Sequence, residues 1–196
     1  MRLRQETKNA CHRAEAGQTT PGLVVSVTRK NAAKDIRDPT NFAIMYTRQE
    51  ISRQREAFWT TFGQYMRPVL SADGLKVNWV NYKTGIAGIH FKMEAHHAYA
   101  GIAIVLSHAD TALRNEQYQQ FARLRELLHE ALGEEWQWLE GTEDEFGKPV
   151  SIIKKELPQV NINNNEDWPK LISFFKQRII ALDEFWSAAK YTFEQL

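Results

Sequence analysis

Apolar and polar residues alternate strictly along residues 88–94, which read GIHFKME. Alternation with a period of two is typical of a strand with one buried face, and it places His90, Lys92 and Glu94 together on the polar face. The following stretch, Ala98–Ser107, is apolar on both faces, as expected for a central strand. The two stretches together predict a β-hairpin.

Other segments repeat their apolar residues at helical spacing or alternate them as strands do. Predicted helices cover residues 47–66, residues 111–132 and a segment that starts near residue 167. Further strands are predicted at residues 76–82, 134–140 and 150–157. Thr47 and Glu50 have the spacing of a capping box, so the first helix is expected to begin at Thr47. The order α-βββ-α-ββ-α predicts an α+β fold, with a mainly antiparallel sheet packed by helices.

Residues 1–44 show neither the helical nor the strand spacing of apolar residues, apart from the short apolar stretch Leu23–Val27. They contain eight Lys and Arg residues against four acidic ones, a net charge of +4, whereas residues 45–196 contain 17 basic and 20 acidic residues, a net charge of −3. We interpret residues 1–44 as a disordered extension, or as a mis-annotated segment upstream of a true start at Met45. Residues 45–196 are then a single α+β domain.

Composition narrows the class of protein. The mildly acidic main body disfavours nucleic acid as a partner, because binding to phosphates depends on Lys and Arg. Cys11 is the only cysteine, so no disulfide framework is predicted within one chain. The basic N-terminus is not followed by an apolar stretch, and the longest apolar run, Ala98–Leu106, is too short to span a bilayer as a helix. These features predict a cytoplasmic protein without a membrane segment.

Several long, aromatic-rich stretches resemble a bacterial family known as domain of unknown function 4268. They are Phe58–Met66, Val77–Gly85, Leu106–Asp110, Leu128–Trp138 and Asp167–Trp186. The resemblance extends from Met45 to the C-terminus. The family has no established activity, so it implies no catalytic residues. Some longer members carry the domain beside other modules, including nuclease-like ones, and this implies an accessory role.

The histidines at residues 90–108 do not predict a metal site. A zinc ion needs three or four convergent ligands, and His90 and Glu94 lie about 13 Å apart along one strand face. His96 and His97 are neighbours at the expected turn, so in a strand their side chains would diverge. We predict no metal and no cofactor.

The order α-βββ-α-β matches the core of the PD-(D/E)XK nucleases, so a restriction-endonuclease-like topology is an alternative. Their chemistry needs a carboxylate near the second strand and an acid-x-Lys motif on the third, which hold Mg²⁺ and activate water. The predicted third strand contains neither group. Trp79, Trp136 and Trp138 are interpreted as core residues rather than as platforms for stacking bases.

A ligand pocket is expected at the C-terminal end of the third predicted strand, around His108 and Asp110. Asp110 is also a plausible N-cap for the next helix. If the hairpin turns at His96 and His97, residue 90 lies opposite about residue 103. Neighbouring strands would then add further polar side chains to the pocket, namely His90, Lys92, Glu94, Tyr82 and Lys83.

A surface of Lys, Glu and His side chains suits a small polar or anionic ligand better than a metal. The leading hypothesis is a non-catalytic interaction or ligand-binding module. The alternative is a degenerate or unusual PD-(D/E)XK-like metal-dependent nuclease. Phe174, Ile180 and Phe185 lie outside the main apolar stripe of the last helix. Such surplus apolar surface favours an unidentified protein partner or a second copy of the chain.

Overall fold

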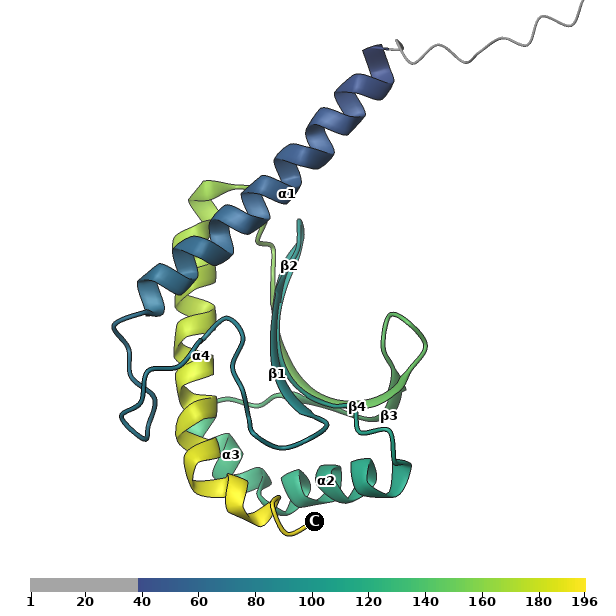
Figure 1. Cartoon of the computed structure of the whole chain (residues 1–196), viewed down its shortest axis with the longest axis vertical. Coiled ribbons are helices and arrows are strands. Elements are labelled where there is room, and N and C mark those ends of the chain that lie inside the picture. Colours follow the sequence, from purple (N-terminus) through teal and green to yellow (C-terminus); the bar gives the residue numbers. More distant parts are fainter. Residues whose placement is uncertain (1–38) are drawn as a thin grey trace, which may run out of the picture. The chain divides into compact units, whose positions relative to one another are not determined.

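A computed structural model describes the backbone of residues 39–196 and the side chains of residues 48–196 (Figure 1). The elements are α1 (Pro39–Met66), β1 (Ile89–Ala95), β2 (Tyr99–Leu106), α2 (Thr111–Arg123), α3 (Arg125–Leu132), β3 (Gln137–Glu143), β4 (Pro149–Pro158) and α4 (Trp168–Ala189). Short 3-10 helices at Asn165–Asp167 and Lys190–Thr192 flank α4. The predicted α+β class is confirmed, and the observed order is α-ββ-αα-ββ-α.

The four strands form one antiparallel sheet in the order β1-β2-β4-β3. The hairpin of β1 and β2 is confirmed, but its predicted register was wrong by two residues, because His90 pairs with Val105. His96 still takes part in the ladder, since its N–H donates to the carbonyl of Tyr99 at 2.8 Å. The turn therefore lies at His97 and Ala98, one residue later than predicted.

The sheet is curved, and Figure 1 shows α4 and α2 along its convex side. The side chains that face these helices are apolar and buried, and they form one core with α1 and α4. Its largest fully buried members include Phe58, Phe62, Ile102, Ile104, Phe121, Ile153, Phe175 and Trp186. Trp79 and Trp136 are 2% and 6% exposed, as expected for core residues. Phe174 and Phe185 of α4 are also buried, which leaves little of the surplus apolar surface that we expected there.

The predicted strand at residues 76–82 is wrong, because this stretch lies in a loop that connects α1 to β1. The Oδ1 atom of Asn78 accepts from the backbone N–H groups of Val80 and Asn81 at 3.1 Å. This local turn competes with strand pairing. Trp79 is buried in the core and donates to the carbonyl of Val69. The α-βββ-α-β order, on which the nuclease analogy rested, is therefore not found in residues 39–196.

Two predicted helix boundaries were also wrong. Helix α1 begins at Pro39, so Thr47 lies inside the helix and does not cap it. The predicted helix at residues 111–132 is divided at Leu124, whose N–H is shared between the carbonyls of Gln120 and Phe121. Our interpretation of residues 1–44 falls mostly on residues 1–38, which lie outside the described part of the chain.

Candidate binding groove

The concave face of the sheet carries a groove of about 470 Å³. No helix of the described part of the chain covers this face in Figure 1. The groove is lined mainly by alternate residues of β1, β2 and β4, with Ile102 between two of them on β2, and by the turn between β3 and β4. The lining side chains include Lys92, Glu94, His96, Tyr99, Gly101, Ala103, Val105, Glu143, Asp144, Glu145, Val150, Ile152, Lys154 and Glu156.

Strand register arranges these side chains in rows that run across the sheet. The acidic row comprises Glu94, Gly101 and Glu156. The basic row comprises Lys92, Ala103 and Lys154. The apolar row comprises Val105 and Ile152, with His90 at its β1 end and Leu139 at its β3 end. Successive rows are two residues apart along each strand, which corresponds to about 6.6–6.8 Å.

Small residues of β2 form the floor of the groove. Gly101 and Ala103 lie at the centre of the acidic row and the basic row, between the long charged side chains of β1 and β4. A Cβ atom added to Gly101 would lie 3.2 Å from Oε1 of Glu94, so this carboxylate extends over the glycine. The floor itself is therefore low and charged on both sides, and the Glu94 carboxylate covers it at Gly101.

The turn between β3 and β4 forms one wall of the groove. Its shape depends on Asp144, whose Oδ1 accepts from the backbone N–H groups of Phe146 and Lys148 at 2.9 Å. The bond from the N–H of Lys148 contributes most to lowering the pKa of the Asp144 carboxyl. Glu143 and Glu145 flank it. In total, five carboxylates and two lysines line the groove, a net charge of −3.

His96 lines the groove beside the acidic row. Its ring stacks on Tyr99 with 4.7 Å between the ring centroids. Its Nε2 atom lies 3.6 Å from Oε2 of Glu94, and its Nδ1 atom lies 3.4 Å from a guanidinium nitrogen of Arg55 in α1. His90 lies at the β1 end of the apolar row. Burial lowers the pKa of His90, and the neighbouring Lys92 and Lys83 lower it further. His90 is therefore neutral near pH 7.

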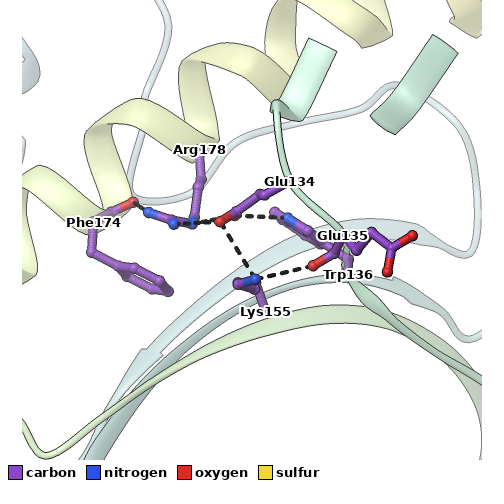
Figure 2. A network of polar contacts seen from close by, with 6 residues as sticks. All are labelled: Glu134, Glu135, Trp136, Lys155, Phe174 and Arg178. Atoms are coloured by element: carbon purple, nitrogen blue, oxygen red, sulfur yellow. Dashed lines mark hydrogen bonds and ion pairs between the residues drawn. The ribbon is translucent and has the colours of Figure 1, made fainter. Parts of the chain in front are cut away.

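A second polar cluster lies on the convex side, where the chain passes from α3 to β3 (Figure 2). The guanidinium of Arg178 donates to both carboxylate oxygens of Glu134, at 2.7 and 2.8 Å, and Trp136 Nε1 donates to the same carboxylate at 3.0 Å. Lys155 Nζ lies 3.5 Å from Glu134 and donates to the carbonyl of Glu135. Both oxygens of Glu134 are thus occupied by protein groups, so this cluster joins α4 to the sheet.

Comparison with family models matches residues 54–190 to the family described as Domain of unknown function (DUF4268). The match covers well over half of the 196 residues. The chain belongs to the DUF4268 family. This confirms the resemblance drawn from the aromatic-rich stretches. No curated protein and no solved structure matches the chain.

The DUF4268 domain brings together three of the seven residues that we predicted to bind a ligand. His90, Lys92 and Glu94 share the concave face, and Lys92 and Glu94 line the groove. Tyr82 lies on the opposite side of the sheet, where its ring stacks on Phe91 with 5.3 Å between the centroids. Lys83 is exposed in the loop before β1 and close enough to His90 to affect its pKa.

The remaining two predicted residues hold the start of α2. The Nδ1 atom of His108 accepts from the N–H of Asp110 at 3.1 Å, and Oδ1 of Asp110 accepts from the N–H of Ala112 at 2.8 Å. Asp110 is thus the N-cap of α2, as predicted. Neither side chain lines the groove, and a role for them in ligand binding stays a prediction.

Our sequence reasoning missed the contribution of β4 to the site. Ile152, Lys154 and Glu156 alternate with residues that face the helices, and this alternation is a usable signal. Their place beside β2 depends on a pairing between strands that are distant in the sequence. Among the described side chains, no group of three or more His, Cys, Asp or Glu residues could hold a metal ion. None of the helices in residues 39–196 is long and apolar enough to cross a membrane.

Proposed function

We propose that this DUF4268 domain is a non-catalytic binding module of the cytoplasm, and that the concave face of its sheet is the binding surface. One observation carries the proposal. Helices cover the convex face of the sheet, whereas the concave face carries a groove of about 470 Å³ between charged side chains. Ligand pockets typically measure about 300–1,000 Å³, so the groove has a suitable size.

The contrast between the two faces supports this interpretation. Alternate residues of β2, from Ala100 to Leu106, are fully buried against the helices. Of the residues between them, Gly101 and Ala103 form a floor whose flanking side chains are glutamates and lysines. A low floor with charged flanks offers both close approach and orientation to a polar ligand.

Filling the floor tests the proposal. The variant Ala103→Trp places a large side chain in the groove, and Ala112→Trp, at an exposed position at the start of α2, is the matched control. The probes are amino acids, dipeptides and pentapeptides of positive, negative and mixed charge, added one at a time to labelled protein and followed by amide NMR shifts. Circular dichroism and thermal melting establish that both variants fold.

We expect at least one probe to shift the amides of β1, β2 and β4 around the groove. Ala103→Trp should weaken that probe about tenfold or more, corresponding to about 1.4 kcal/mol, while Ala112→Trp binds as the wild type does. The proposal is wrong if no probe shifts these amides, or if a folded Ala103→Trp variant binds as tightly as the wild type.

A further inference from the structure

The distance between neighbouring charged rows equals the distance between side chains on one side of an extended peptide. The acidic row and the basic row are two residues apart on β2, about 6.6–6.8 Å, and the apolar row follows at the same interval. In an extended peptide, the side chains that point to one side are also two residues apart. A peptide that lies along β2 can therefore present one side chain to each row.

We propose that the groove binds an extended peptide segment with a basic, an acidic and an apolar side chain at positions i, i+2 and i+4, in either chain direction. The basic side chain lies between Glu94 and Glu156, and the acidic side chain lies between Lys92 and Lys154. The apolar side chain covers the apolar row. This inference rests on the proposed function, because it names the ligand of the same groove.

The low floor is the feature that favours a peptide. Gly101 and Ala103 have almost no side chain, so the main chain of a ligand can lie over them while its side chains contact the taller walls. The carboxylate of Glu94, which extends over Gly101, has to turn aside toward the basic side chain of the ligand. The present ion pair between Lys154 Nζ and Glu156 Oε1, at 2.6 Å, has to open for the ligand. The cost is small, because ion pairs between partly exposed side chains contribute little to stability.

The net charge of the lining adds a preference among peptides. Glu143 and Glu145 at the wall, together with the other charged side chains that line the groove, leave it with a net charge of −3. The basic side chain of the peptide therefore contributes more than the acidic one. We expect a peptide with two lysines to bind second best, and one with two glutamates to bind least.

Peptide isomers test the spacing. The designed probe is acetyl-Lys-Ser-Glu-Ser-Val-amide, and its isomer acetyl-Lys-Glu-Ser-Ser-Val-amide puts the two charges on opposite sides of an extended chain. Titrations at low salt, followed by amide NMR shifts, give the dissociation constants. We expect the designed probe to shift the groove amides and to bind at least about fivefold more tightly than its isomer.

Charge reversal tests the rows. The double variant Lys92→Glu/Lys154→Glu turns the basic row acidic and should prefer acetyl-Lys-Ser-Lys-Ser-Val-amide over the designed probe, whereas the wild type prefers the designed probe. The control Lys76→Glu/Lys170→Glu changes the net charge equally at exposed positions outside the groove, and it should keep the wild-type preference. Thermal melting checks that both variants fold.

Three outcomes overturn the inference. In the first, other probes bind in the groove but the wild type binds the two isomers equally well; in the second, the charge-reversed variant keeps the wild-type preference. Either result means that the groove does not bind a peptide of this pattern, and the proposed function stands. If no probe of any class shifts the groove amides, the inference and the proposed function fail together.

Discussion

The hydroxyl of Tyr82 donates a 2.6 Å hydrogen bond to Oδ1 of Asp183, a residue of α4 that is only 3% exposed. The other oxygen of this carboxylate accepts from the N–H of Ala72 at 2.6 Å. Tyr82 and Ala72 belong to the loop between α1 and β1, so one buried side chain of α4 holds two parts of that loop.

Removing the hydroxyl of Tyr82 should destabilise the protein. The variant Tyr82→Phe leaves one oxygen of a buried carboxylate without its donor, and hydrogen bonds to charged groups contribute about 1.5–3 kcal/mol. We expect the free energy of unfolding in urea to fall by about that amount. Tyr65→Phe, at a half-exposed position, is the control and should change it by less than about 0.5 kcal/mol. Equal effects in the two variants would contradict a structural role for the bond.

The same bond predicts a change of stability at high pH. Burial raises the pKa of Tyr82 above its ordinary value near 10, and the bond to Asp183 raises it further. A raised pKa in the folded state means that the contribution is fully present below about pH 10 and is lost as the pH rises above it. Unfolding in urea between pH 8 and 11 should show a steeper fall for the wild type than for Tyr82→Phe. Parallel curves would refute this assignment.

Glu134 should stabilise the protein most above its own titration range. Burial alone would raise the pKa of this carboxyl, but the bonds from Arg178, together with Trp136 and Lys155, lower it below the ordinary value of 4.5. A lowered pKa means that the contribution is present above about pH 4.5 and is lost as the pH falls further. Glu134→Gln should therefore cost roughly 1–3 kcal/mol at pH 7 and less at pH 3.

The control for Glu134 is its neighbour. Glu135 is exposed, and its contact in the cluster is made by its backbone carbonyl, so Glu135→Gln should leave the free energy of unfolding almost unchanged at both pH values. A Glu135→Gln variant as unstable as Glu134→Gln would show that general charge, and not the bidentate pair, is responsible.

Two glycines with similar backbone angles should respond differently to alanine. Gly88 has a φ of +79°, and an added Cβ would lie 2.7 Å from Cβ of His108, whereas Gly85 has a φ of +81° and no atom within 4 Å. Gly85→Ala should cost only the left-handed backbone term, about 1–2 kcal/mol. Gly88→Ala should cost clearly more, because the contact adds to that term. Denaturant unfolding of both variants measures the difference, and equal costs would contradict the close approach of the two segments.

Local patterns in the sequence were sufficient to predict which side chains of β1 face the core and which face the open side of the sheet. The alternation at residues 88–94 placed Phe91 in the core and Lys92 and Glu94 on the open side, as the structure has them. The apolar run of β2 was less informative. Its residues look equally apolar on both faces, yet Ile102 faces the helices and Ala103 faces the groove.

The composition of the groove could not be predicted, because it depends on which strands pair and in which register. Lys154 and Glu156 join Lys92 and Glu94 only through the pairing of β2 with β4. The break at Leu124 has no proline or glycine to mark it, so the sequence reads as one helix there. At residues 76–82 the apolar spacing of a strand was present, but the turn made by Asn78 prevailed.

The central role of α4 has a consequence for how the chain folds during synthesis. Asp183 binds the loop before β1, Arg178 binds the segment before β3, and Trp186 donates to the carbonyl of Thr84. Every one of these partners leaves the ribosome before α4 does. A nascent chain that lacks this helix leaves the apolar side chains that α4 covers exposed to water, and such exposed surface makes a partly synthesised chain prone to aggregate.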